Sequence, residues 1–357
     1  ITMAKHTPVP CPQHPTYDIR KVVRAALEED AGDRGDITTL STVPAETQAV
    51  ATFLAKAEGV IAGLGVADMV LQEVDPTVKV DWQICDGDRV KPGQILGSMR
   101  GSARAILVAE RIMLNFMQRM SGIATATAAM VAATNGLPTK VLETRKTVPG
   151  LRMLDKWAVL IGGGANHRLG LFDMMMIKDN HIAAAGGIRA AVMRAEKYIR
   201  EEGLVGKVGV EVETRTMAEV DEILEVMRDL EHQHKEQQQQ QQAAAAAAGS
   251  AADAEPGASG SGGDGALARA VARGHHVVRV MLDNMARQDA GKEGGVDVTM
   301  LAEAVGRIGD AVETEASGNV TLASIRPIAA TGVTYVSVGA LTHSVTALDI
   351  SLNIETQ

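Results

Sequence analysis

Cationic side chains gather in one stretch of an otherwise acidic chain. The 357 residues carry 35 Lys and Arg against 44 Asp and Glu, a formal net charge of −9. Residues 144–182 nevertheless hold six Lys or Arg and two His against three Asp, and the cations and histidines are Arg145, Lys146, Arg152, Lys156, Arg168, Lys178, His167 and His181. Because guanidinium groups bind carboxylates and phosphates in planar, bidentate geometry, this stretch indicates an anion site. A solvated basic face with surface ion pairs is the alternative.

Two acidic residues and two turns further along the chain extend this chemistry. Glu213 and Asp283 could hold ribose hydroxyls or Mg²⁺, which prefers oxygen ligands, or could simply form local salt bridges. The small, hydroxyl-rich turns at 316–319 and 337–344 could bind a phosphate through backbone N–H groups at helix N-termini. The Gly-rich segment 162–170 lacks the spacing of nucleotide-binding loops. The residues thus indicate an enzyme for a multiply anionic, phosphate-bearing substrate.

The elements that must position these residues alternate between β-prone runs and helical patterns from residue 139 onward. The runs are Lys140–Glu143, Met174–Ile177, Val208–Val212, Val277–Leu282, Ala311–Glu315 and Val333–Val338. Helical patterns at Ile188–Arg200, Met217–Leu230 and Met300–Ile308 lie between them. This alternation predicts βα units and a parallel sheet, either open or closed.

Polar side chains follow directly after every one of these runs. They are Arg145 and Lys146, then Lys178 to His181, Glu213, Asp283 and Asn284, Ser317 and Gly318, and finally Gly339 and His343. Because the carboxyl ends of parallel strands meet at one edge, this pattern favours a (β/α) barrel enzyme with its site at that edge. An open α/β sheet would also place its site there.

The first third of the chain has a different pattern. Strands are expected at Thr47–Ala55, Val78–Ile84 and within 86–96, followed by a long apolar helix at Ala103–Thr134. Aromatic residues make up only 2%, so we expect cores of Ala, Val, Ile, Leu and the 17 Met. No apolar run reaches the roughly 18 residues of a membrane helix, and the negative charge argues against nucleic-acid binding. The two cysteines form neither a disulfide framework nor a metal-ligand pattern.

A Gln-, Ala-, Gly- and Ser-rich insert interrupts the second part at 232–265. Its Gln/Ala half could prolong the preceding helix until Gly249, and we expect no catalytic role, with partner binding as the alternative. The chain should therefore contain a flexible segment at 1–16, an N-terminal domain with its linking helix at 17–134, a barrel at 135–345, and a tail at 346–357 that returns to the first domain.

Several strings are more specific than these patterns and resemble the quinolinate phosphoribosyltransferase family. They include EEDAGDRGDITT (28–39), AERIMLNFMQRMSGIAT (109–125), ETRKTVPGLRMLDKWAV (143–159), GGGANHRLGLFDMMMIKDNHI (162–182), VEVET (210–214), VMLDNM (280–285), ETEASGNV (313–320) and TGVTYVSVGALTHS (331–344). The resemblance covers about residues 17–231 and 266–353. It implies an N-terminal α/β sandwich domain and a C-terminal incomplete (β/α) barrel with fewer than eight strands.

The resemblance also implies a reaction and a role for each matching residue. The phosphoribosyl group of phosphoribosyl pyrophosphate would pass to the ring nitrogen of quinolinate, with decarboxylation to nicotinate mononucleotide. Quinolinate would contact Arg145, His167, Arg168, Lys178 and, from a partner subunit, Arg111. Phosphoribosyl pyrophosphate would contact Lys146, Lys178, Glu213, Asp283, Ser317, Gly318, Gly339 and His343. Lys146, Lys178, Glu213 and Asp283 would be the catalytic set, and the last two would hold Mg²⁺.

The family resemblance further implies a homodimer with shared sites, or a hexamer built as a trimer of dimers, and no nucleic-acid or membrane partner. A molybdenum-transport-associated homologue of the same fold and a phosphosugar-binding descendant without turnover are the alternatives. Because the chain starts at Ile1 rather than Met, we expect that an upstream segment was removed or left out. The location would be intracellular: the cytoplasm, or a plastid or mitochondrion if that segment was a presequence.

Overall fold

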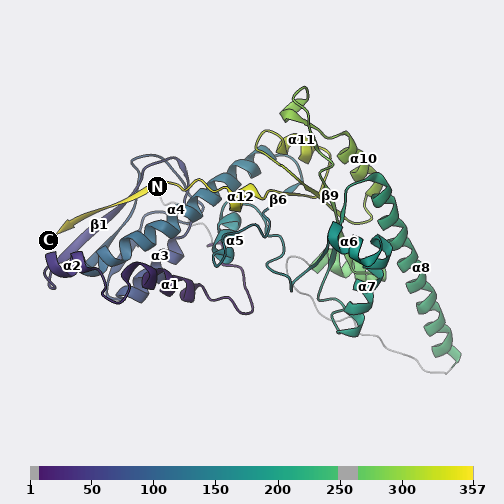
Figure 1. Ribbon diagram of the computed structural model, residues 1–357, viewed down its shortest axis with the longest axis horizontal. Coiled ribbons are helices and arrows are strands. Elements are labelled where there is room, and N and C mark those ends of the chain that lie inside the picture. The colour runs from purple at the N-terminus through teal and green to yellow at the C-terminus, as the bar shows by residue number, and fades with distance from the viewer. Residues whose placement is uncertain (1–7, 248–263, 357) are drawn as a thin grey trace. The chain divides into compact units, whose positions relative to one another are not determined.

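A computed structural model describes residues 8–247 and 264–356 of the chain (Figure 1). Its contacts divide the chain into two compact units. Unit 1 comprises 1–135, 141–169 and 338–357, and unit 2 comprises 136–140 and 170–337. Residues 141–169 and 338–357, which include the segments after the first and last strands of the predicted barrel, therefore make most of their contacts within unit 1.

Unit 1 is built on a four-stranded antiparallel sheet in the order β14-β1-β5-β3. These strands are β14 (Ile350–Thr356), β1 (Gln48–Ala55), β5 (Ile95–Ser102) and β3 (Lys79–Trp82). Burial alternates along β1, the period-two pattern of a sheet with one face on the core. The C-terminal segment thus returns to the first domain, with Ala55 opposite Ile350 in the register.

One face of the long helix α4 (Ala103–Ala133) supplies much of the core of unit 1. Met113, Met117 and Met120 recur at helical spacing and are fully buried, together with Phe53 and Leu96 of the sheet. Methionine replaces the missing aromatic bulk here, since its flexible chain fills irregular gaps. The other elements of this unit are α1 (Ile19–Ala31), α2 (Ile37–Thr42), β2 (Gly59–Val60), α3 (Leu64–Val74), β4 (Arg89–Val90), α5 (Arg152–Ile161) and α12 (Ala340–His343).

The N-terminal segment expected to be flexible is described from residue 8. Val9 and Cys11 pack against the core of unit 1, and the Trp157 indole donates a hydrogen bond to the Val9 carbonyl at 2.9 Å. From residue 8 onward, packing therefore anchors this segment.

The second sheet has six strands in the order β6-β13-β12-β9-β8-β7. The strands are β6 (Lys140–Leu142), β7 (Met175–Ile177), β8 (Val210–Thr214), β9 (Val277–Asp283), β12 (Glu313–Ser317) and β13 (Tyr335–Ser337). The pairs β7–β8, β8–β9, β9–β12 and β12–β13 are parallel.

This strand order is that of a barrel opened at one seam. Each strand from β7 to β13 lies beside the next of the six, and the first strand, β6, lies beside the last. Only the pairing of β6 with β7 is missing. The free side of β6 instead meets a short bridge, in which the Ala165 N–H donates to the Val141 carbonyl at 2.8 Å. The predicted incomplete (β/α) barrel is confirmed.

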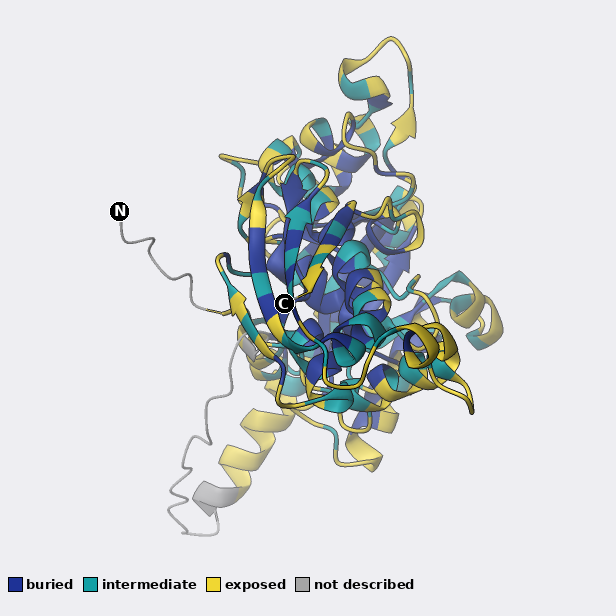
Figure 2. Ribbon diagram, turned by 90° about the vertical axis from the view of Figure 1, so that its left-hand side faces the viewer, coloured by how far each residue is buried: buried dark blue, intermediate teal, exposed yellow. Residues whose placement is uncertain are grey.

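Helices follow the strands of unit 2 as the βα rhythm predicts. They are α6 (Asp179–Ala185), α7 (Ile188–Glu201), α8 (Met217–Ala247), α9 (Asp264–Ala272), α10 (Thr299–Ile308) and α11 (Ile325–Ala330), with short elements β10 (Arg287–Gln288), η1 (Glu293–Gly295) and β11 (Val296–Asp297). Helix α8 continues through the Gln run to Ala247, with exposed side chains from Lys235 to Ala244 (Figure 2). Residues 248–263 of the predicted insert lie outside the described residues.

All six β-prone runs of the second part are strands, with ends shifted by up to two residues. The long helix begins at Ala103 as predicted and ends one residue earlier, at Ala133. In the described part of the chain, no helix combines the length and apolar character needed to cross a membrane.

Asp86 gives unit 1 a pH-dependent term in its stability. Its carboxylate accepts a hydrogen bond from the Leu64 N–H at the start of α3 at 3.1 Å, where Gly63 caps the helix with φ +101° and no side chain. Burial raises the pKa of Asp86 to about 6, although the hydrogen bonds from Leu64 and Gly63 oppose the shift. An acid with a raised folded pKa destabilises the fold once it ionises, so stability falls as pH rises from about 4 to about 6.

We therefore predict that Asp86→Asn removes this loss. The amide oxygen can still accept from Leu64 but cannot ionise. Relative to wild type, the variant should gain on the order of 1–2 kcal/mol at pH 7, after allowance for solvent screening, and nothing at pH 4. Thermal unfolding of both proteins from pH 4 to 7.5 measures the difference. A variant that is equally or less stable at every pH would contradict the assignment.

Candidate active site

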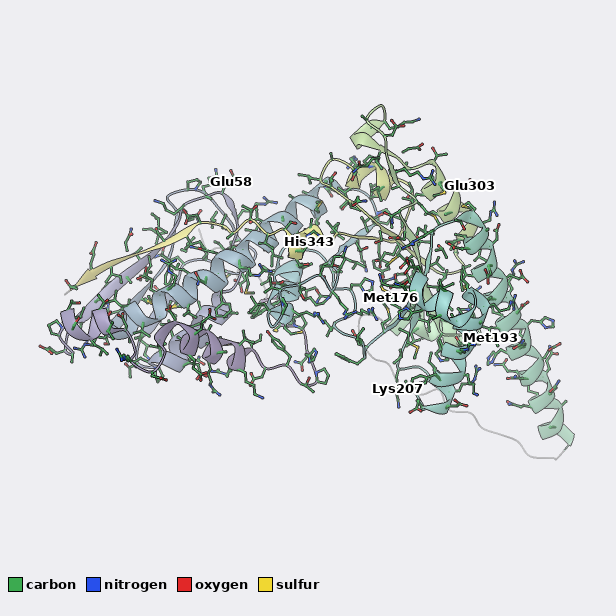
Figure 3. All side chains as sticks on the ribbon, in the orientation of Figure 1. Glu58, Met176, Met193, Lys207, Glu303 and His343 are labelled. Carbon is green, nitrogen blue, oxygen red and sulfur yellow. The ribbon has the colours of Figure 1, made fainter. Side chains whose placement is uncertain are left out.

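In unit 1, the residues after β6 meet the residues after β13. A Cβ on Gly339 would lie 3.1 Å from the His343 ring and 3.3 Å from Cδ of Lys146, so these three predicted residues are neighbours. The Thr342 hydroxyl donates to the Lys146 carbonyl at 2.8 Å and ties the two segments together. Lys146 and His343, the latter labelled in Figure 3, are both exposed. We call Arg145, Lys146, His167, Arg168 and His343 the cation group.

The turn that carries His167 and Arg168 is held by a fully buried ion pair. Glu143 and Lys156 are 0% exposed and form a salt bridge. The same Glu143 oxygen accepts the His167 N–H at 3.1 Å, and Lys156 Nζ donates to the His167 carbonyl at 3.1 Å. Burial raises the pKa of Glu143, and the adjacent Lys156 ammonium opposes that shift.

The ring of His167 is oriented by its own neighbour. The Arg168 N–H donates to Nδ1 of His167 at 2.6 Å, and the side chain of His167 is buried. Since Nδ1 accepts, the neutral ring carries its hydrogen on Nε2. His167 can therefore donate a hydrogen bond to an anion from Nε2.

In unit 2, carboxylates converge at the carboxyl ends of the strands. Arg215 lies 2.9 Å from Asp179, 2.9 Å from Glu213 and 3.2 Å from Asp283, measured between nitrogen and carboxylate oxygen. Lys178 lies 3.7 Å from the other Glu213 oxygen. The structure thus brings together Lys178, Glu213 and Asp283, as predicted from their positions after β7, β8 and β9. We call Asp179, Glu213 and Asp283 the carboxylate group.

The carboxylate group is suited to a hard cation. Burial raises the pKa of Glu213, Lys178 lowers it, and the nearby charge of Asp283 raises it again. All three carboxylates already point at one positive centre, the Arg215 guanidinium. Mg²⁺ is usually held by one or two carboxylates together with water and substrate phosphates, so Glu213 and Asp283 are the side chains of this group that could hold it.

Ser317 and Gly318 form a turn locked against the end of β9. The Asn284 N–H donates to the Ser317 carbonyl at 2.9 Å, and both Asn284 and Asn319 have positive φ. A Cβ at Gly318, which has φ +112°, would lie 2.3 Å from the Asn284 side chain, so only glycine fits.

One expectation about this turn was wrong. The next helix, α11, begins only at Ile325, so the turn does not offer a helix N-terminus to a phosphate. The left-handed residues 318 and 319 make the chain turn at this point. Gly339, by contrast, directly precedes the short helix α12.

Arg111 stands apart from the cation group of its own chain. It is exposed on α4, eight residues before Arg119. Arg119 contacts both Asp155 and the carbonyl of Thr342, the residue whose hydroxyl bonds Lys146. A helix rises 1.5 Å per residue, so Arg111 lies about 12 Å along α4 from that contact.

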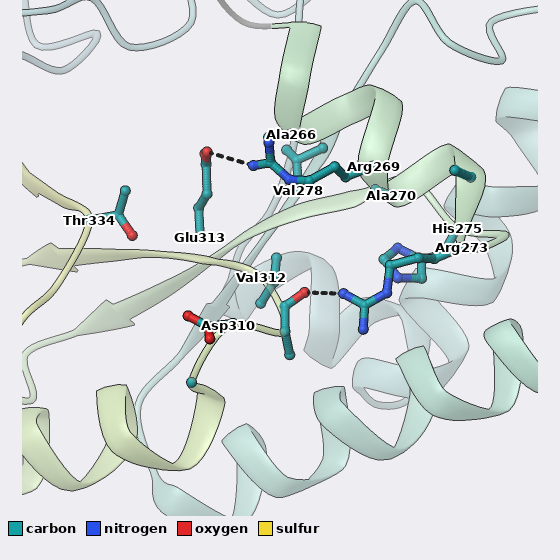
Figure 4. Close-up of a pocket in the computed structure, with 13 residues that line it drawn as sticks. Ala266, Arg269, Ala270, Arg273, His275, Val278, Asp310, Val312, Glu313 and Thr334 are labelled. Carbon is teal, nitrogen blue, oxygen red and sulfur yellow. Dashed lines mark hydrogen bonds and ion pairs between the residues drawn. The ribbon is translucent and has the colours of Figure 1, made fainter.

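A cavity of about 590 Å³ lies elsewhere in unit 2 (Figure 4). It is lined by α9, by the first residues of β9 and β12, and by the loop at 309–312. Its two arginines are already engaged: Arg269 pairs with Glu313 at 3.6 Å, and Arg273 donates to the Ala311 carbonyl at 2.7 Å. Because it opens at the amino ends of β9 and β12, it lies at the opposite end of these strands from the carboxylate group.

Comparison with known proteins identifies the family of this chain. The family model for the N-terminal domain of quinolinate phosphoribosyl transferase matches residues 36–121, and that for the C-terminal domain matches 123–263 and 264–353. The chain belongs to this family. Quinolinate phosphoribosyltransferase [decarboxylating] 1b of Nicotiana tabacum is 48% identical over 97% of this chain and 85% of its own length.

Two further relatives extend the family likeness. The chloroplastic nicotinate-nucleotide pyrophosphorylase [carboxylating] of Oryza sativa subsp. japonica is 49% identical over 98% of this chain and 81% of its own length. The crystal structure of NadC from Streptococcus pyogenes has a TM-score of 0.73 and 32% identity, covering 95% of this chain and 97% of that one.

Sequence reasoning overlooked four residues that hold these groups. The pattern assigns Glu143 only to a strand, Lys156 only to the basic stretch and Asp179 only to the polar residues after a strand, and it gives Arg215 no role. Each lies within four residues of a predicted site residue or on the following helix, which is the one signal that could have found them.

Arg215 and a divalent cation should compete for the carboxylate group. We predict that Arg215→Gln raises the affinity for Mn²⁺, a spectroscopic substitute for Mg²⁺, by about tenfold, because removing one positive charge about 3 Å from three carboxylates strengthens their potential. Electron paramagnetic resonance of free Mn²⁺, titrated without substrates, measures the constant.

Arg189→Gln is the matched control. Arg189 is equally half-exposed and pairs with Glu225 and Asp229, on α8. Its loss should leave Mn²⁺ affinity unchanged. Unchanged or weaker Mn²⁺ binding by the Arg215 variant would show that the carboxylate group is not a cation site.

Proposed function

We propose that this chain transfers the phosphoribosyl group of phosphoribosyl pyrophosphate to the nitrogen of quinolinate and releases pyrophosphate and CO₂. The product is nicotinate mononucleotide, a precursor in de novo NAD biosynthesis. Family membership and the names of the relatives support this activity. The observation that carries it is the His167–Arg168 turn, which a buried ion pair holds in place within a group of cations.

The cation group is suited to quinolinate, which has two carboxylates on adjacent ring carbons. Arg145 and Arg168 can bind carboxylates in bidentate geometry, and His167 can donate from Nε2. Lys178 would add a further cation. Fixing both carboxylates orients the ring nitrogen toward the carbon it attacks. This orientation raises the reaction rate beyond what tighter binding alone would give.

The transfer itself follows from the chemistry of the two substrates. The ring nitrogen forms a bond to the anomeric carbon of ribose while the bond to pyrophosphate breaks. The ring then carries a positive charge, so the 2-carboxylate can leave as CO₂ and its bonding electrons remain beside the cationic nitrogen. A proton adds to that carbon.

Phosphoribosyl pyrophosphate offers phosphates that cations can bind and ribose hydroxyls that carboxylates can bind. Its phosphates are proposed to contact Lys146, Ser317, Gly318, Gly339 and His343. Its ribose is proposed to contact Glu213 and Asp283. Mg²⁺ bound by the carboxylate group would neutralise charge on the leaving pyrophosphate.

The decisive assay combines purified protein, quinolinate, phosphoribosyl pyrophosphate and Mg²⁺, with detection of nicotinate mononucleotide and CO₂. Nicotinate mononucleotide and CO₂ are expected in equal molar amounts. Absence of product under all conditions would favour the molybdenum-transport-associated relative or a binding protein without turnover.

Nicotinate should be a very poor substrate. It lacks the 2-carboxylate, so the cations placed for that group would enclose the ring without the anion they are placed to bind. We expect kcat/KM to fall by roughly 10⁴-fold relative to quinolinate. Pyrophosphate release measured with both acids in one preparation tests this, and comparable turnover of nicotinate would contradict the assigned role of the cation group.

The proposed assembly is a homodimer, or a hexamer of three dimers, in which each site receives Arg111 from the partner. The position of Arg111, about 12 Å along α4 from the Arg119 contact, supports this arrangement. Complementation tests it: Arg111→Ala and Lys146→Ala, each nearly inactive, are mixed so that subunits exchange. In a mixed dimer one site carries both defects and the other none, so roughly a quarter of all sites should recover.

Mixing Lys146→Ala with Arg145→Ala is the control. Both defects lie in the cation group of the same chain, so every site of a mixed dimer keeps one of them and activity should stay low. If exchange is verified by mass and the Arg111 mixture also stays inactive, Arg111 does not act across subunits.

We infer a plastid or mitochondrial location, since the rice relative is named chloroplastic and relative 2a of Nicotiana tabacum mitochondrial. A fluorescent fusion of the whole gene product found only in the cytosol would contradict this.

A further inference from the structure

Helix α5 brings two consecutive charged residues into the interior of unit 1. Asp155 and Lys156 are both 0% exposed. Asp155 accepts two hydrogen bonds from Arg119, each at 2.8 Å. Lys156 faces the other way, toward Glu143 and the turn at 166–168. A buried charge costs free energy unless it is paired, so each of these residues demands a specific partner.

The Lys156–Glu143 pair grips residue 167 on both sides. Glu143 accepts the backbone N–H of His167, and Lys156 donates to the backbone C=O of the same residue, each at 3.1 Å. The Asn166 side-chain amide, turned so that its NH₂ group faces these acceptors, donates to the second Glu143 oxygen at 3.1 Å and to the Lys156 backbone carbonyl at 3.0 Å. With both peptide groups around His167 fixed, the backbone dihedrals of this residue have little freedom.

The fixed backbone of this turn determines the direction of the His167 and Arg168 side chains. The Arg168 N–H donates to Nδ1 of His167 at 2.6 Å, so the ring orientation depends on where the peptide between them lies. The Arg168 side chain leaves from the same fixed turn. A shift of the turn would move both groups together and would leave Lys146 in place, because Lys146 is held separately through Thr342.

We propose that Lys156, Glu143 and Asn166 are positioning residues for quinolinate: they set the direction of the His167 and Arg168 side chains without contacting the substrate. This inference rests on the proposed function, because it assigns His167 and Arg168 to quinolinate. It predicts a selective effect, since the phosphate contacts of Lys146 and His343 do not pass through the turn.

A double substitution separates positioning from plain stability. Lys156→Met alone or Glu143→Gln alone leaves an unpaired or unbalanced buried group, so both single variants should unfold at lower temperature. Lys156→Met combined with Glu143→Gln removes both charges at similar volume, and most of the lost thermal stability should return. The hydrogen bond that Lys156 donates to the His167 carbonyl is lost in this variant, so one of the two backbone contacts of residue 167 is removed. The double variant should therefore show a KM for quinolinate raised about tenfold, with KM for phosphoribosyl pyrophosphate changed less than about twofold.

Glu196→Gln is the control for loss of a buried carboxylate. Glu196 is also 0% exposed and pairs with His276 at 2.8 Å in unit 2, away from the residues assigned to substrates. It should lower the unfolding temperature and leave both KM values unchanged. Glu143→Asp serves if the double variant does not fold, because it keeps the charge and withdraws the carboxylate by one methylene. It should raise KM for quinolinate selectively.

A second readout does not depend on turnover. Hydrogen exchange of the amides at 166–168 should become faster in the double variant and in Glu143→Asp, and stay as in wild type in Glu196→Gln. If wild type makes no nicotinate mononucleotide, the proposed function fails. Hydrogen exchange at 166–168 still tests whether Lys156 and Glu143 hold the turn in place. A recovered double variant with normal exchange and both KM values of wild type would overturn the inference, since the pair would then be structural only.

Discussion

The cost of isolating a charge in the interior is the constraint on which this structure depends. Glu143, Asp155, Lys156, Glu196 and Glu315 are all 0% exposed, and each has an oppositely charged or histidine partner. Removing one member of such a pair costs about 3–5 kcal/mol, far more than a surface ion pair contributes. Each pair therefore penalises any arrangement of its segments that separates the two members. Apolar packing would hold the same segments together but would tolerate several registers.

Strand β8 shows how this constraint and the chemistry share one element. Glu211 and Glu213 are two residues apart, so both point to the same face of the strand. Glu211, the deeper one, lies 3.8 Å from Arg279, which also bonds Glu315 at 2.8 Å and stacks over the Tyr335 ring at 4.0 Å. Glu213, at the carboxyl end, meets Lys178 and Arg215 instead, both of which are partly exposed. Along one face of β8, the charge pairs are thus buried in the interior and partly exposed at the carboxyl end of the strand.

The sequence predicted the elements well, because strands and helices of this fold have clear apolar periods and the polar residues follow each strand. It located Lys146, Lys178, Glu213 and Asp283 by that rule. It could not find the partners that hold them. Lys156 falls inside an amphipathic helical pattern, where hydropathy assigns a lysine to the surface, and yet it is fully buried. The contact between Gly318 and Asn284 joins residues 34 positions apart and depends on two left-handed conformations that no periodicity reveals.

The net charge of −9 hides a separation of charge between the cation group and the carboxylate group. In unit 1 the acids nearest the cation group are neutralised from within: Glu143 by Lys156, and Asp155 by Arg119. The positive charge of Arg145, Lys146 and Arg168 is therefore not cancelled by these two acids. In unit 2 three carboxylates share Arg215, so negative charge prevails there by formal count. In the proposed function, the first environment would suit a dicarboxylate, and the second would suit ribose hydroxyls and a divalent cation.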